Sequence, residues 1–324
     1  MVKQLQVSIF AGLLLVSAAG WGQTALRAWN IHPDGYPVTE AMKSFVDEVG
    51  RSTKGKYKIE LFSNGSLGDQ PKAVQMLKSG EVDVAEFSSA PLSDVVPGLK
   101  AFNLPFLFTD SAHMFRYLDG QLGARLAVKL ADAGFVVLGW YDGGARSFYC
   151  ANKPINTGAD LVGQKIRVQQ SDVYIGMVTQ LGATPMPLPY KDVLDALQQK
   201  KIDCAENNMP SYESTGHYKV AKYVYLTNHV VSPEALVVST KLWTQLSADD
   251  KALFQKAGQN SALLMRELWT KRVASARATV TKEGAQVVTV TDFAPFVRKM
   301  APLYAKYLAD PTVRAELFTI IGNQ

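Results

Sequence analysis

The feature that most constrains this chain is a helix-then-strand pattern that occurs twice. The stretch "AVQMLKSGEVDVAEF" (73–87) can be set against "VLDALQQKKIDCAEN" (193–207), which aligns Asp83 with Asp203 and Glu86 with Glu206. Each copy places apolar residues at helical spacing and ends in a short run typical of a strand. This match, together with the same order of elements before each copy, indicates two units built alike.

In the first unit the pattern alternates between strand and helix. Strands are predicted at 25–29 and 57–62, on either side of a helix at 37–50 whose apolar residues share one face. Asp69 is suited to cap the second helix and Gly80 to end it.

The second unit repeats this order. "QKIRVQQ" (164–170) is a predicted strand, Ser171 can cap the next helix, the proline-rich run 183–188 is extended, and Tyr190 opens a further helix. Strands separated by helices predict an α/β fold of parallel sheets with helices on both faces. Two such domains facing each other form a cleft at the carboxyl ends of their strands, where ligands bind.

The last third of the chain predicts connections between the two domains. "PEALVVSTKLW" suits a strand that crosses back, and 248–284 has no proline and one interior glycine, which predicts one long or kinked helix spanning both domains. The predicted division is domain I at 23–145 plus 233–270 and domain II at 146–232 plus 271–324.

The N-terminus has the layout of a secretory signal peptide. A basic Lys3 precedes an apolar run from Val7 to Ala19, followed by small residues. The run is short for a membrane span, although an uncleaved anchor stays open as an alternative. We predict cleavage after Gly22, a signal peptide at 1–22 and export of the mature chain to the periplasm.

Several function classes lack their signatures in this chain. The 34 basic and 29 acidic residues are spread along it, which argues against nucleic-acid binding. Nucleophile-elbow, phosphate-loop, dinucleotide and zinc-protease motifs are missing. The four histidines have no metal-ligand spacing, so we expect neither a metal nor a cofactor. Cys150 and Cys204 are either one disulfide, as export permits, or two separate thiols.

Two arginines at the ends of apolar strands are the main candidates for binding chemistry. Arg167 lies inside "KIRVQQ" and Arg146 between "GG" and an aromatic strand. A planar guanidinium can grip a carboxylate through two parallel bonds, although a single arginine at a strand end is more often a structural ion pair. Two of them beside a cleft favour binding of an organic acid.

Other polar and aromatic residues near strand ends complete the candidate site. Asn207 and Asn208 can recognise hydroxyl groups, and Glu86 can accept hydrogen bonds from them. Tyr190 can stack on an apolar ligand face, as can Phe87, although a core position suits Tyr190 equally well. His32 can reach a ligand hydroxyl or be a plain loop residue.

An enzyme is the alternative from another class. Glu86 and Glu206 could face each other across the cleft as the carboxylate pair of a glycosidase-like enzyme. An exported enzyme acting on sugar acids therefore stays open, although glutamates at strand ends are more often hydrogen-bond acceptors.

The chain resembles the periplasmic solute-binding proteins of tripartite ATP-independent periplasmic (TRAP) transporters. The runs that carry this resemblance are "GQKIRVQQSD", "GATPMPLPYKDVLDALQQKKIDCAENNMPSY", "HYKVAKYV" and "PEALVVSTKLW", in the family's order. The resemblance implies a two-domain, type II-like periplasmic binding protein fold with crossing hinge strands. It also implies a cleft that closes on its ligand and a membrane permease as partner. The residues that match the family's ligand contacts are Arg167, Arg146, Asn207 and Tyr190.

Other runs resemble the branch of this family that takes sugar acids, hexuronates in particular. These are "HPDGYP", "YDGGARSFY" and "ENNMPSY". The chain departs from that branch at Glu86, where an arginine is more usual. A carboxylate there would accept bonds from sugar hydroxyls and repel a second acidic group. We therefore expect a transporter subunit that captures a hexuronate or a related acid, with a ligand-sensing protein as a further alternative.

Overall fold

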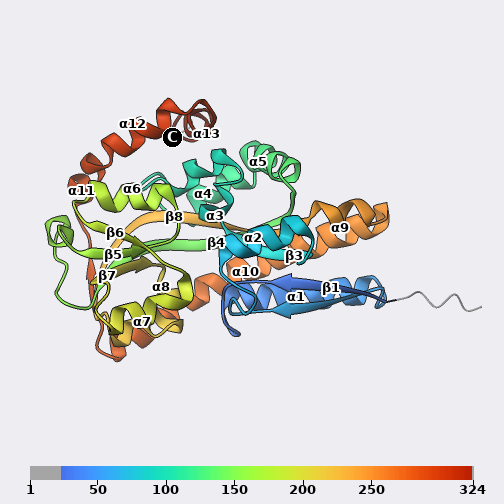
Figure 1. Cartoon of the computed structure of the whole chain (residues 1–324), viewed down its shortest axis with the longest axis horizontal. Helices are drawn as coiled ribbons and strands as arrows, with labels where there is room; N and C mark the ends of the chain where they lie inside the picture. The colour runs from blue at the N-terminus through green and yellow to red at the C-terminus, as the bar shows by residue number, and fades with distance from the viewer. Residues whose placement is uncertain (1–22, 323–324) are drawn as a thin grey trace, which may run out of the picture.

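The computed structural model describes residues 23–322 as one nine-stranded sheet with helices on both faces (Figure 1). Its strands follow the order β2-β1-β3-β8-β4-β7-β5-β6, and β9 pairs with β8. The predicted signal peptide at 1–22 lies outside the described residues. Within the described range, every helix is too short or too polar to cross a membrane.

The strands are β1 (Thr24–Trp29), β2 (Tyr57–Phe62), β3 (Val84–Ser88), β4 (Phe135–Cys150), β5 (Lys165–Val168), β6 (Thr184–Pro187), β7 (Cys204–Asn207), β8 (Tyr223–Ser239) and β9 (Gln286–Thr289). The α-helices are α1 (Pro37–Ser52), α2 (Gln70–Ser79), α3 (Ser89–Leu92), α4 (Ser111–Leu118), α5 (Gln121–Asp132), α6 (Asp172–Gln180), α7 (Val193–Gln198), α8 (Met209–Ser214), α9 (Thr240–Gln245), α10 (Ala248–Lys282), α11 (Ala294–Lys299), α12 (Ala301–Ala309) and α13 (Pro311–Ile321). Short 3-10 helices are η1 (Pro97–Asn103), η2 (Gly158–Leu161), η3 (Tyr190–Asp192) and η4 (His217–Lys219).

The first unit, β1 to α5, has the predicted alternation of strand and helix. β1 pairs in parallel with β2 and with β3. The carboxylate of Asp69 accepts a hydrogen bond from the Lys72 backbone and so caps α2, while Gly80 ends that helix with a φ of 77°. Both predicted helix signals are confirmed.

The second unit, β5 to α8, repeats the first at the level of individual hydrogen bonds. Asp83, before β3, accepts a bond of 2.8 Å from the Arg27 backbone N–H, and Asp203, before β7, accepts one of 2.8 Å from Lys165. In both units the aspartate's own N–H donates back to the same residue's carbonyl oxygen, at 2.9 Å. The predicted architectural repeat is confirmed in structure.

Two local predictions in the second unit need correction. Ser171 does precede α6, but its side chain makes no capping bond. Tyr190 opens a 3-10 turn, η3, and the α-helix begins only at Val193.

Two long antiparallel strands, β4 and β8, join the units. Their pairing runs from Phe135 opposite Ser239 to Cys150 opposite Tyr223, so both strands contribute to both halves of the sheet. Irregular pairing between Asp142 and Ala145 includes Gly144, whose φ is 70°. Such a bulge re-aims the residues that follow it, and Arg146 comes next.

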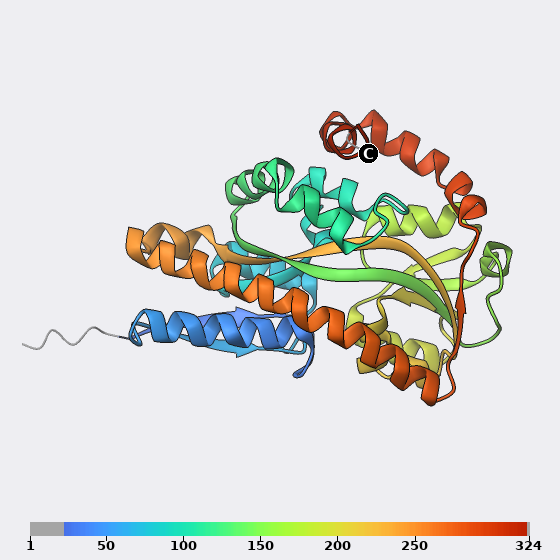
Figure 2. The same cartoon turned by 180° about the vertical axis from the view of Figure 1, so that it is seen from behind.

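The helix α10 has 35 residues and runs across both units on the face that Figure 2 turns toward the viewer, which confirms the predicted domain-spanning helix. It lies against β4 at its one interior glycine, Gly258. A Cβ there would lie 2.5 Å from that of Leu138, and a Cβ on Gly139 would lie 2.8 Å from the Gly258 carbonyl oxygen. The two glycines therefore permit the helix to touch the crossing strand.

The hydrophobic core has three parts. The largest covers one face of the sheet under η1, α4, α5, α6, α12 and α13. The other two lie on the opposite face, one under α1 and α10 and one under α7 and α8.

The C-terminal helix α13 contacts the first unit, because Glu316 of α13 forms ion pairs with Arg125 and Lys129 of α5. The division into domains I and II stays a prediction.

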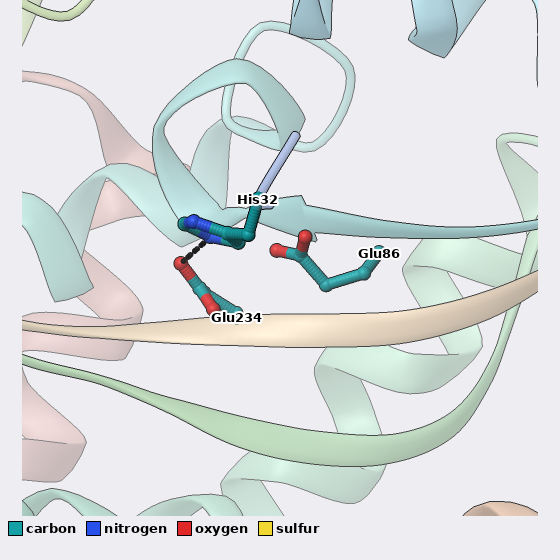
Figure 3. Close-up of side chains that lie close together, drawn as sticks. All are labelled: His32, Glu86 and Glu234. Carbon is teal, nitrogen blue, oxygen red and sulfur yellow. Dashed lines mark ion pairs between the residues drawn. The ribbon is translucent and has the colours of Figure 1, made fainter. Parts of the chain in front are cut away.

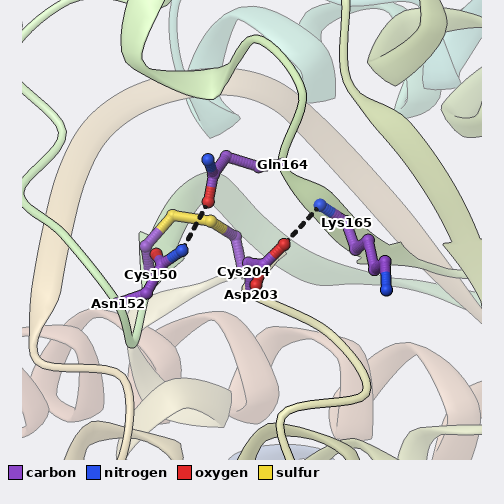
Figure 4. The surroundings of a disulfide bond; sticks show 6 residues. All are labelled: Cys150, Asn152, Gln164, Lys165, Asp203 and Cys204. Atoms are coloured by element: carbon purple, nitrogen blue, oxygen red, sulfur yellow. Dashed lines mark hydrogen bonds between the residues drawn. A yellow bond between two sulfur atoms is a disulfide. The ribbon is translucent and has the colours of Figure 1, made fainter.

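The two cysteines form a disulfide across β4 and β7 (Figure 4). Cys150 and Cys204 are direct partners in the antiparallel pairing of these strands. They are separated by 54 positions in the sequence, so the disulfide closes a loop of that length. The alternative of two separate thiols is therefore excluded.

We predict that the double substitution Cys150→Ala and Cys204→Ala lowers the free energy of unfolding by about 4 kcal/mol, because a cross-link over a loop of this length restricts the unfolded chain. Thermal unfolding should show a midpoint several degrees lower. A reductant should destabilise the wild type in the same way and leave the double variant unchanged. An unchanged midpoint would contradict the prediction.

Candidate functional site

A pocket with polar walls lies between the two units. It collects residues at the carboxyl ends of β1, β3, β5 and β7, where ligands bind in sheets of this kind. Contacts between the units close over it, since the Tyr36 hydroxyl lies 2.9 Å from Ser211 Oγ and 3.3 Å from Asn208 Oδ1. The polar residues that line it are His32, Asp69, Gln70, Ser88, Arg146, Arg167, Gln169, Gln170, Tyr190, Asn207, Asn208, Ser211 and Glu234.

Arg146 is held mainly by the protein itself. Its Nε and Nη2 donate to the carboxylate of Glu206 at 2.5 and 2.8 Å, Nη2 also donates to the Glu206 carbonyl oxygen, and Nη1 donates to Asn207 Oδ1. A guanidinium has five N–H donors, so one remains for a ligand. Arg146 therefore acts first as a structural ion pair at the edge of the pocket.

Glu206 is fully buried and ionised. Burial alone would raise its pKa, but the charge of Arg146 and the bond from His229 outweigh burial and lower the pKa to about 2. The alternative in which Glu206 faces Glu86 across the cleft is not supported, because the carboxylate of Glu206 bonds to Arg146 instead. The geometry of a glycosidase carboxylate pair is absent at these two positions.

Arg167 has a different environment. Its Nε and Nη2 both donate to the carbonyl oxygen of Leu188, at 3.0 and 2.7 Å, and it forms no ion pair within the part of the chain that the structure describes. The residue is only 3% exposed. Burial lowers its pKa, and the nearby Glu206 charge opposes this without bonding to it. Three N–H donors on Nη1 and Nη2 are left, in the arrangement that binds a carboxylate through two bonds.

The two asparagines at the end of β7 have different roles. Asn208 is used by the fold: its Nδ2 donates to the Gly143 carbonyl oxygen, and its Oδ1 caps α8 by accepting from Ser211 N–H. Asn207 accepts from Arg146 and from the Asn208 backbone through Oδ1, and its Nδ2 group stays available on the pocket wall.

Aromatic rings close one side of the pocket. His32 stacks on Tyr36 with ring centres 4.1 Å apart, and it meets the edge of Tyr190 at 5.8 Å. The hydroxyl of Tyr190 is buried beside the hydroxyls of Ser211 and Ser214. These contacts place Tyr190 and His32 at the pocket, as the sequence predicts.

A cluster of His32, Glu86 and Glu234 lies on the first-unit wall (Figure 3). His32 Nε2 is 3.5 Å from Glu234 Oε1, and the donor atoms of the three residues lie within 4.8 Å of one another, close enough to hold a cation. Burial, and then the neighbouring Glu234 carboxylate, raise the pKa of Glu86 well above its usual value. Glu86 itself lies behind Glu234 and does not line the pocket.

Phe87 is a wrong prediction for the site. It is fully buried and packs against Trp29 and Phe135 in the largest core cluster. Side chains alternate along a strand, so the neighbours Glu86 and Ser88 take the opposite face of β3.

Sequence reasoning also missed several pocket residues. Glu234 lies inside a long apolar strand, directly after Pro233, and a buried charge at such a position is a usable signal. Gln169 and Gln170 follow the predicted strand β5 and could have been inferred from their place at its carboxyl end. Gln70 and Ser211 have no comparable signal in the sequence. They reach the pocket from the first turns of α2 and α8.

We predict that Glu206→Gln destabilises the protein by about 3–5 kcal/mol at pH 7, because the substitution leaves Arg146 as a buried charge without its partner. Denaturant unfolding measures this loss. Glu267→Gln is the matched control, since Glu267 pairs with Lys271 on the exposed face of α10 and should cost under about 0.5 kcal/mol.

The same pair predicts a pH dependence. The pKa of Glu206 in the folded protein, about 2, lies below its ordinary value of 4.5, so its stabilising contribution is complete above pH 4.5 and is lost as the pH falls toward 2. The difference in stability between wild type and Glu206→Gln should therefore shrink over this interval. A difference that stays constant down to pH 2 would contradict the assignment.

Comparisons with known proteins identify the family. The model of the bacterial extracellular solute-binding proteins of family 7 (DctP) matches residues 30–310. A TRAP periplasmic solute-binding protein from Roseobacter denitrificans, with bound β-D-glucuronate, is 42% identical, has a TM-score of 0.90, and the match covers 92% of this chain and 99% of that one. One from Sulfitobacter sp. NAS-14.1, with bound β-D-galacturonate, is 39% identical with a TM-score of 0.90 and coverage of 93% and 100%.

A solute-binding protein of Chromohalobacter salexigens is 36% identical over 100% of this chain and 97% of its own length. The predicted α/β periplasmic binding-protein fold is thus confirmed by its solved relatives. The chain belongs to family 7 of the bacterial extracellular solute-binding proteins, the solute-binding proteins of TRAP transporters.

Proposed function

We propose that this protein captures a hexuronate, D-glucuronate or D-galacturonate, in the periplasm and delivers it to the membrane permease of a TRAP transporter. The observation that carries the proposal is Arg167, a buried guanidinium in the pocket with three free donors and no ion pair among the described residues. A buried charge is stable only with a partner, and a ligand carboxylate supplies it. Two solved relatives bind these same two uronates.

The remaining pocket groups suit the hydroxyls of a sugar ring. Asn207 Nδ2 can donate, and the unpartnered oxygens Gln169 Oε1 and Glu234 Oε2 can accept. Tyr190 gives the ring an apolar surface. Because these groups come from both units, a bound ligand would hold the units together, which is how a binding protein couples ligand capture to closure.

Export and the permease partner follow from the family and from the predicted signal peptide at 1–22. The relatives are named as solute-binding proteins, so we infer reversible binding without chemical change of the ligand. NMR spectra of glucuronate incubated with the protein should keep their resonances. New product resonances would favour the alternative of an exported enzyme.

We predict that Arg167→Ala weakens glucuronate binding by about 100-fold to 1,000-fold, because two charge-assisted hydrogen bonds are lost together. Isothermal titration calorimetry measures the change. Arg51→Ala, on the exposed end of α1, is the control and should bind as the wild type does. Undiminished binding by Arg167→Ala would overturn the assignment.

A thermal-shift panel tests the ligand class. At a concentration of about 100 times Kd, a bound ligand stabilises the folded state by about 2.7 kcal/mol and raises the midpoint by a few degrees. We expect glucuronate and galacturonate to do so, and neutral glucose and C4-dicarboxylates to leave the midpoint unchanged. A shift with C4-dicarboxylates alone would replace the hexuronate in the proposal.

A further inference from the structure

The pocket has a basic wall from the second unit and an acidic wall from the first unit and the adjoining strand β8. Arg167 provides the basic wall, and Glu234, with Glu86 behind it, provides the acidic one. Since the pocket lies between the units, these two walls face the two ends of a bound ligand. With the carboxylate of a uronate on Arg167, the acidic wall meets the hydroxyl end of the sugar.

The two glutamates of the acidic wall differ from the other buried glutamates of residues 23–322. Glu206 pairs with Arg146, and Glu316 pairs with Arg125 and Lys129. Glu86 and Glu234 have no lysine or arginine within ion-pair distance in that range. The nearest ionisable partner is His32, at 3.5 Å from Glu234.

The acidic wall also has few hydrogen bonds to the rest of the protein. The Oε2 of Glu234 and both ring nitrogens of His32 are buried without a donor or acceptor outside the cluster among the described residues. Ser88 Oγ donates to Glu234 Oε1 at 3.5 Å, and the carboxylates of Glu86 and Glu234 lie close enough to share a proton. Buried polar groups of this kind are costly unless something donates to them, so the wall is suited to a ligand group that donates hydrogen bonds or carries positive charge.

On the basis of the function proposed above, we propose that the acidic wall selects ligands by the charge of the group opposite the Arg167-bound carboxylate. An ammonium group binds best, a hydroxyl group binds well, and a second carboxylate is rejected. The ligands that this wall admits are therefore mono-acids, uronates and amino-uronates, and aldaric acids are excluded. A like charge set against a buried charge is strongly unfavourable and is a common source of specificity.

The test compares three ligands of different charge: 2-amino-2-deoxy-D-glucuronate, in which an amino group replaces a ring hydroxyl, D-glucuronate itself, and D-glucarate, the open-chain acid with a second carboxylate. Calorimetry at pH 7 in a chelator, so that no metal ion neutralises the wall, gives the three Kd values. We expect glucarate to bind at least about 100-fold more weakly than glucuronate, and the amino-uronate about 10-fold more tightly.

The double variant Glu86→Gln, Glu234→Gln is the decisive comparison, because the two neighbouring carboxylates can share a proton and only replacing both removes the charge for certain. The ratio of the glucarate and glucuronate Kd values should fall by at least about 10-fold in this variant. Glu267→Gln, on the exposed face of α10, should keep the wild-type ratio. A ratio that stays unchanged in the double variant would overturn the proposal.

The wild-type series decides the matter even if the double variant fails to fold. Glucarate bound within about 3-fold of glucuronate would overturn the charge selection and leave the proposed function standing. A wild type that binds no uronate at all would overturn the proposed function, and the charge selection with it.

Discussion

The antiparallel pairing of β4 with β8 is the constraint on which the rest of this structure depends. These two strands run through both units and join them into one sheet, and α10 lies across them where Gly139 and Gly258 let helix and strand touch. The pocket forms because the carboxyl ends of the parallel strands of both units meet where the two units join. The bulge before Arg146 lies on β4 at this point, so the connection between the units also shapes the pocket.

The buried charges divide into those that serve the fold and those that serve the ligand. Arg146 and Glu206 neutralise each other, which holds β4 against β7 beside the disulfide. Arg167 lies in the same pocket and bonds to a carbonyl oxygen instead of a carboxylate, and Glu234 has only His32 as an ionisable neighbour of opposite sign in the described chain. An unneutralised buried charge weakens the fold and favours any state in which a partner arrives, so the closed pocket is best stabilised when a ligand of matching charge occupies it.

Much of the architecture could be predicted because local patterns decide it. Helical spacing, the Asp69 cap and the Gly80 stop located the elements, and the alignment of Asp83 with Asp203 located the repeat. The site was harder to predict. Arg167 was found at a strand end, but Phe87 was placed in the site wrongly, since which face of a buried strand meets the pocket depends on its neighbours in the sheet.

The sequence by itself determined the α/β class, the two similar units and the helix that spans them, because periodicity and helix-ending residues act over a few neighbouring positions. Only the tertiary structure decided the partner of each buried charge. Arg146 and Arg167 look alike as arginines at strand ends, yet one meets Glu206 and the other meets a carbonyl oxygen. Glu234 comes beside Glu86 from 148 positions further along the chain. Such pairings depend on strand order and register, which local sequence patterns do not specify.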